Sequence, residues 1–175
     1  MKSHEIFRRM SPALAVQIFT FLQAEQKSVY KLAIQGLANQ RNLRGVFIER
    51  KPVAERHVWM REALGRGVSD VLAGHILQGW LLGANKRMLC EFLDALGIKH
   101  AEDGTVDELP PEPPKEKVLS AVEQLLGKYP AEKVAVYLCA FQDMDSTLSW
   151  PVLNEIISSD NRLVLGGEQV GAAVE

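Results

Sequence analysis

The stretch that decides the fold is VLAGHILQGWLLGA, residues 71–84, which carries apolar side chains around most of a helix surface. Only His75 and Gln78 interrupt it, and Ser69 or Asp70 can cap its start. A helix that is apolar on nearly all sides has to be wrapped by other elements. At 14 residues the run is also too short to cross a bilayer, which needs about 20. We therefore expect a core helix at the centre of the molecule.

Apolar residues recur at helical spacing on both sides of this stretch, and we find no alternating pattern typical of a strand. Ser11-Pro12 shows how the boundaries are marked, since a cap residue is followed by the proline that suits a first turn. Residues 41–51 are ambiguous and predict a short turn of helix at most. The expected helices cover residues 12–24, 27–40, 52–64, 71–82, 86–96, 116–126, 131–142 and 151–158. The sequence thus predicts an all-α protein, a compact bundle of about seven to eight helices built from helical hairpins.

A change in composition divides the chain. Residues 1–100 form the expected basic helical bundle, and residues 101–114 are acidic and end in DELPPEPP. Because proline stiffens the backbone and removes a hydrogen-bond donor, this segment is predicted to be a linker. Residues 115–165 are expected to form a helical hairpin plus a short helix that packs on the bundle. The last residues, 166–175, lack periodicity and predict a flexible tail.

The charge of the chain is divided in the same way. Residues 1–100 carry 15 Lys or Arg against 8 Asp or Glu, whereas residues 101–175 carry 5 against 14. Residues 1–100 therefore have a formal net charge of +7 and residues 101–175 one of −9, which together give the −2 of the chain. The densest basic stretch is residues 41–66.

Three interpretations of the basic stretch remain open. The acidic half can neutralise it by packing against it, within one chain or across a homodimer. It can instead form a surface for an acidic protein or a small anion. Nucleic-acid binding is the third, and a pI near 6.1 and the lack of any recognition-helix, zinc-finger or aromatic-platform pattern argue against it. The residues expected on such a surface are Arg41, Arg44, Arg50, Arg56 and Arg61.

Two pairs of residues are candidates for binding a small ligand. His75 and Gln78 share a face of the central helix, where a buried imidazole would act as proton acceptor or pH sensor. The alternative is a core histidine bonded to a neighbouring carbonyl. His57 and Arg61 lie four residues apart and could together clamp a carboxylate or phosphate. The alternative for this second pair is a solvated helix face.

Recognisable catalytic chemistry is absent from the sequence. No nucleophile elbow, phosphate-binding loop or dinucleotide fingerprint occurs, and neither the four histidines nor the two cysteines have metal-ligand spacing. We therefore assign no catalytic residue, metal or cofactor, and we leave open whether the protein is an enzyme. Cys90 and Cys139 lie in apolar helical runs and are too few for a disulfide scaffold, which predicts free thiols.

The leading functional hypothesis is a non-catalytic binding or adaptor protein built of helices. With no signal peptide or membrane span in the sequence, a cytoplasmic protein with no membrane partner is expected. It is expected to act as a monomer or homodimer. A ligand-binding protein or enzyme with a pocket around His75 is the first alternative, and nucleic-acid association through residues 41–66 is the second.

Overall fold

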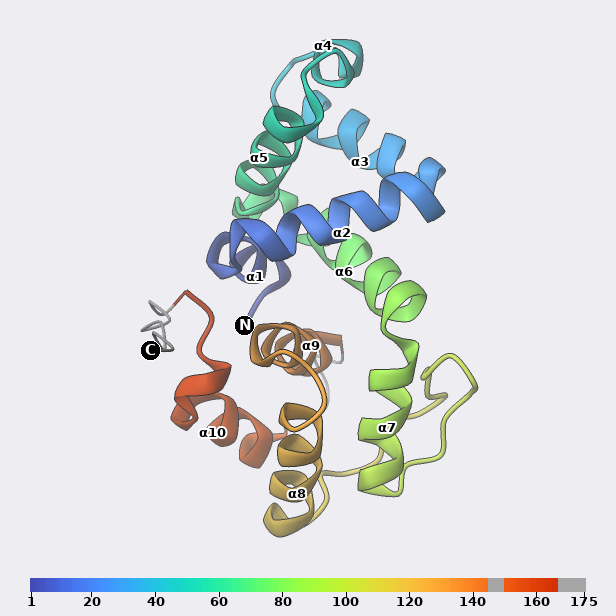
Figure 1. Ribbon diagram of the computed structural model, residues 1–175, viewed down its shortest axis with the longest axis vertical. Helices are drawn as coiled ribbons and strands as arrows, with labels where there is room; N and C mark the ends of the chain where they lie inside the picture. Colours follow the sequence, from blue (N-terminus) through green and yellow to red (C-terminus); the bar gives the residue numbers. More distant parts are fainter. Residues whose placement is uncertain (145–149, 167–175) are drawn as a thin grey trace, which may run out of the picture.

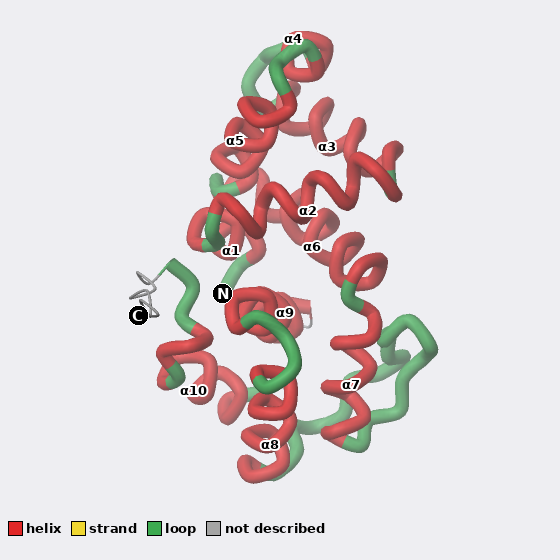
Figure 2. The backbone as a smooth tube through the Cα atoms, in the orientation of Figure 1, coloured by secondary structure: helices red, strands yellow, loops and turns green. Residues whose placement is uncertain are grey.

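The computed structural model describes residues 1–144 and 150–166, and every regular element in them is a helix (Figures 1 and 2). The α-helices are α1 (Ser3–Arg9), α2 (Pro12–Glu25), α3 (Lys27–Asn39), α4 (Gly45–Glu49), α5 (Val53–Leu64), α6 (Asp70–Ala84), α7 (Lys86–Leu96), α8 (Lys115–Leu126), α9 (Ala131–Met144) and α10 (Pro151–Ser159). Single 3-10 turns occur at Gly67–Ser69 and Asn161–Leu163. The prediction of an all-α bundle is confirmed. None of the helices in these residues is long and apolar enough to span a membrane.

Helix α6 contains the stretch 71–84 and is the element that the others surround. It packs against α1, α2, α3, α5, α7 and α9. In Figure 1 it passes from the upper group of helices, α1 to α5, to the lower group, α7 to α10. Its buried side includes Ile76, Leu77 and Trp80. The wrapping is incomplete, because His75 and Gln78 both face solvent. The predicted core helix therefore has one open face.

Helix α1 was not among the predicted helices, and it connects the two groups. Its Ile6 and Phe7 side chains are completely buried. It packs against α5, α6 and α9, which come from both groups. With seven residues, α1 has only about two turns, and isolated helices of this length are not stable in water. It depends on these tertiary contacts.

The start of α2 is joined to α9 by hydrogen bonds. The Ser11 hydroxyl accepts from the Leu14 backbone N–H at 3.1 Å, which is the cap that the Ser11-Pro12 pair predicted. Glu132, at the start of α9, accepts from the backbone N–H of Ser11 and from its hydroxyl, the latter at 2.7 Å. The Ser11 side chain thus caps α2 and also links it to α9 by a hydrogen bond.

Glycines let neighbouring side chains approach α6 closely. A Cβ at Gly83 would lie 2.6 Å from the Phe21 ring, and one at Gly79 would lie 2.9 Å from the Gln26 amide oxygen. Gln26 also donates a hydrogen bond to the Gly79 carbonyl at 3.1 Å. The junction between α2 and α3 therefore packs directly against the α6 backbone at Gly79 and Gly83.

The acidic, proline-rich segment contains no helix, and it is held in place at two points. Near its start the Ala101 N–H donates to the Thr105 carbonyl at 2.8 Å, which closes a turn. Near its end the Glu112 carboxylate accepts from the backbone N–H groups of Val152 and Leu153, at 3.1 and 2.8 Å. Glu112 thereby satisfies free donors in the first turn of α10. The predicted tail at 166–175 lies outside the described residues except for Gly166.

We expect Ser11→Ala to lower the free energy of unfolding by about 1–2 kcal/mol, because the change removes a helix cap and one of the two bonds to Glu132. Denaturant unfolding of both proteins measures this. Ser28→Ala, in the exposed first turn of α3, is the matched control and should change stability by no more than about 0.5 kcal/mol. Equal losses in the two variants would contradict the role given to Ser11.

Candidate functional site

The basic stretch lies at one end of the molecule, on α3, α4 and α5, at the top of Figure 1. Lysines of the later half form ion pairs, as Lys115 does with Glu155 and Lys128 with Glu91. In the described part of the chain, no Lys or Arg between residues 27 and 66 forms an ion pair. Among the described residues, the acidic half therefore forms no ion pair with this end.

Three of the five predicted surface arginines have internal partners. The Arg41 guanidinium stacks on the Trp59 ring, 5.2 Å from its centroid. Arg56 donates to the carbonyls of Glu49 and Lys51, at 2.6 and 3.0 Å. Arg61 donates to the Met10 carbonyl at 2.7 Å, at the C-terminal end of α1, where the helix dipole favours a cation. These three side chains contact other parts of the fold, and their part in an anion-binding surface stays a prediction.

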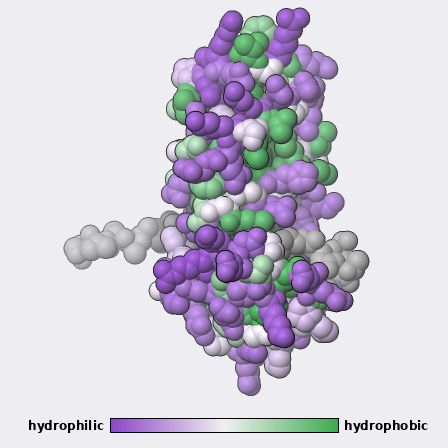
Figure 3. Space-filling model, turned by 90° about the vertical axis from the view of Figure 1, so that its right-hand side faces the viewer, coloured by the Kyte–Doolittle hydropathy of each residue, from purple (hydrophilic) through white to green (hydrophobic). Residues whose placement is uncertain are grey.

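The other two, Arg44 and Arg50, are exposed and flank α4. Neither side chain donates a hydrogen bond to any other described residue. The same segment exposes apolar groups, since Phe47 is 56% exposed and Leu43 and Val46 are at least 40% exposed. We call residues 43–50 the α4 tip. Figure 3, which views the molecule from its right-hand side, shows hydrophobic patches among hydrophilic side chains over the upper half.

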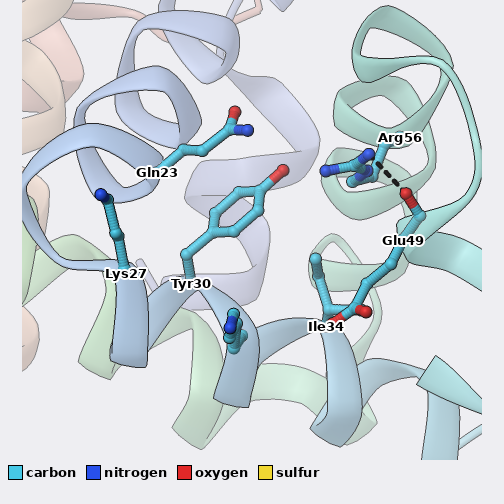
Figure 4. Close-up of a pocket in the computed structure, with 7 residues that line it drawn as sticks. Gln23, Lys27, Tyr30, Ile34, Glu49 and Arg56 are labelled. Atoms are coloured by element: carbon cyan, nitrogen blue, oxygen red, sulfur yellow. Dashed lines mark hydrogen bonds between the residues drawn. The ribbon is translucent and has the colours of Figure 1, made fainter. Parts of the chain in front are cut away.

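Beside the α4 tip, α2, α3 and α5 enclose a pocket of about 340 Å³, which we call the Tyr30 pocket (Figure 4). Tyr30 stands in it, with Gln23 on one side and Arg56 on the other. The residues that line it are Gln23, Lys27, Tyr30, Lys31, Ile34, Glu49 and Arg56. Three cationic side chains and one carboxylate thus surround a cavity that has a phenol at its centre. Such a balance of charges favours an anionic group.

His57 lies behind Tyr30 and is buried, with 2% of its surface exposed. Its Nε2 is 3.2 Å from the Tyr30 hydroxyl, and its ring packs on Phe19. Burial lowers the pKa of the His57 imidazole, and the positive charge of Arg56 lowers it further. A neutral His57 therefore supports Tyr30 from the interior. The alternative of a solvated helix face is wrong for this residue.

His75 and Gln78 lie elsewhere, on the open face of α6. They border a groove of about 400 Å³ that also includes Ser3, Asp70 and Asp143. His75 is exposed, so both a buried imidazole sensor and a core histidine are wrong for it. The Ser3 hydroxyl donates to the Asp143 carboxylate at 3.2 Å, so these two polar groups of the groove already bond to each other.

The structure thus brings together a set of residues different from the predicted one. His57 touches the candidate site from inside, Arg56 lines it, and Arg61, His75 and Gln78 lie outside it. Sequence reasoning missed Lys27, Lys31 and the tyrosine between them. The signal was present, since residues 27, 30, 31 and 34 share one helix face.

Among the described residues, no group of three or more His, Cys, Asp or Glu side chains is placed to hold a metal ion. Both cysteines are free thiols, as the sequence predicted. Comparison of the chain with protein-family models, with curated proteins and with solved structures gave no match. Any conclusion about function therefore rests on the geometry above.

We expect the stability of the protein to fall as the pH drops below about 6.5, the usual pKa of histidine. The pKa of His57 is lowered in the folded state, so under these conditions the unfolded chain binds a proton that the folded chain does not. The free energy of unfolding then decreases with falling pH, by at most about 1.4 kcal/mol per pH unit from this group.

Urea unfolding of the parent chain and of His57→Gln between pH 5 and 8 tests this prediction. As the pH falls below about 6.5, the free energy of unfolding should decrease more steeply in the parent than in the variant. The contributions of the other titrating groups are the same in both proteins and cancel in the comparison. Parallel pH profiles would show that His57 does not titrate differently in the folded and unfolded states.

Proposed function

We propose that the protein is a non-catalytic, cytoplasmic binding protein whose α3–α5 end docks an acidic segment of a partner protein. The observation that carries the proposal is the α4 tip, where exposed apolar side chains lie beside two arginines that have no carboxylate partners among the described residues. Apolar contact supplies affinity, and complementary charge steers the encounter.

The Tyr30 pocket gives this surface a place for a single acidic side chain. Lys27 and Lys31 are exposed at its edge, so their ammonium groups are free to turn toward a carboxylate. The Tyr30 hydroxyl and the Gln23 amide are neutral groups able to donate hydrogen bonds to it. Glu49, the one carboxylate in the lining, opposes two lysines and one arginine.

A protein partner fits this end better than a nucleic acid does. Glu49, Glu55 and Glu62 are exposed among the basic residues and would repel a continuous phosphate backbone. The apolar side chains of Val46 and Phe47 at the tip would also lie against a highly charged surface. An acidic peptide that carries its own apolar residues matches both features.

We expect a fluorescein-labelled peptide rich in Glu and Phe to bind the protein in fluorescence anisotropy, with an affinity that falls as salt is added. Arg44→Glu combined with Arg50→Glu should weaken this binding by about tenfold or more at low salt. Phe47→Ser should weaken it independently of salt, because that change removes apolar contact and leaves the charge unaltered.

The matched control is Lys86→Glu combined with Lys117→Glu, which makes the same change in net charge on exposed residues of α7 and α8. This control should retain most of the peptide binding. Equal losses in the two double variants would show that only overall charge matters and would overturn the docking surface. Tighter binding of a single-stranded oligonucleotide of equal charge would favour the nucleic-acid alternative, and binding of citrate with no peptide binding would favour a small anion.

A further inference from the structure

A separate recess lies at the other end of the molecule, between α6, α7 and α9 and beneath residues 104–109. Its volume is about 350 Å³, within the range of pockets that hold small organic molecules. Six of its thirteen lining residues are aliphatic, namely Leu81, Leu82, Leu89, Leu93, Val106 and Leu109. It shares no lining residue with the Tyr30 pocket. It is therefore an independent candidate for binding.

Tyr137 gives this recess a polar group. The side chain lines the recess and is only 2% exposed. Its hydroxyl makes no hydrogen bond to another described residue, and it is not one of the fully buried polar atoms without a partner there, so it is accessible from the recess. Burial raises the pKa of Tyr137 well above its usual value, so the phenol keeps its proton and remains a donor. A bound molecule with an acceptor atom would satisfy it.

The position of Tyr137 is fixed before any ligand binds. Its ring packs edge-on against Phe92 and Phe141, with centroids 5.5 and 6.1 Å away. The segment above the recess also packs closely against α7. Gly104 has φ +84°, and a Cβ there would lie only 2.7 Å from the Leu89 Cβ on α7. The recess is thus already formed without a ligand, with the Tyr137 ring held between its aromatic neighbours.

The charges around the recess limit what it can accept. Asp107 and Glu108 are part of the lining, and no Lys, Arg or His is. Thr105 and Gln78 add neutral polar groups. A carboxylate or phosphate would enter against two negative charges, with no cation to offset them. The lining therefore selects against anions.

We propose that this recess binds a small, uncharged and largely apolar molecule whose carbonyl or ether oxygen accepts a hydrogen bond from the Tyr137 hydroxyl. The aliphatic wall buries the apolar body, and the phenol fixes its orientation. This site does not depend on the function proposed for the α4 tip, and either one can fail without the other.

The test uses prodan, a neutral naphthalene ketone whose emission shifts to the blue in apolar surroundings and to the red when its carbonyl accepts a hydrogen bond. We expect saturable binding of one equivalent with blue-shifted emission. The anionic dye anilinonaphthalene sulfonate should bind at least about tenfold more weakly, because of the two carboxylates at the recess.

Val106→Trp and, separately, Leu109→Trp place a large ring in the recess from the segment above it, and each should reduce prodan affinity by about tenfold or more. Val58→Trp, on the exposed face of α5, is the matched control and should leave binding unchanged. Tyr137→Phe keeps the ring and should weaken binding by about threefold to tenfold, the range for one hydrogen bond. It should also move the emission of the bound dye further to the blue.

Absence of saturable binding would overturn the proposal, as would tryptophan variants that fold and bind prodan as the parent does. Binding in Tyr137→Phe with unaltered affinity and emission would remove the hydroxyl from the site. Equal or tighter binding of the sulfonate would contradict the selection against anions.

Discussion

The structure depends on the burial of α6 from both sides. Ile76, Leu77 and Trp80 are nearly inaccessible to solvent, and burying a side chain of this size stabilises the fold by about 1.5–3 kcal/mol. No single neighbour can cover such a helix, so α1, α2, α3 and α5 pack along one part of it while α7 and α9 cover the rest. Gly79 and Gly83 let the α2–α3 junction come close enough to exclude water. The two halves of the chain are thereby organised around one element.

Polar contacts then hold helix ends in place, both within and between the two groups of helices. Glu132 bonds to the cap residue of α2, Arg61 bonds to the last carbonyls of α1, and Glu112 occupies the first turn of α10. Each of these charged side chains satisfies helix-end groups that would otherwise have no partner. This explains why the acidic segment is anchored in spite of its linker composition. It also explains why several arginines of the basic stretch are structural.

The α4 tip and the recess at Tyr137 carry charges of opposite sign. The α4 tip combines exposed Phe47 with the unpaired guanidinium groups of Arg44 and Arg50, whereas the recess at Tyr137 is rimmed by carboxylates. The two ligands proposed above, an acidic peptide at the α4 tip and an uncharged apolar molecule in the recess, follow from this layout. Because α6 extends between the two groups of helices, both ends are carried by one continuous packed core.

The sequence by itself determined the all-α class and most helix boundaries, because spacing, caps and prolines act locally, as at Ser11-Pro12. Helical spacing in the sequence also placed Lys27, Tyr30 and Lys31 on one face of a helix. The tertiary structure alone decided which polar residues are buried: His57 lies in the core and His75 in solvent, the reverse of what their surroundings in sequence suggested. It likewise decided that the seven residues of α1 form a helix. The physical reason is that burial depends on which elements cover a face, and those elements come from distant parts of the chain.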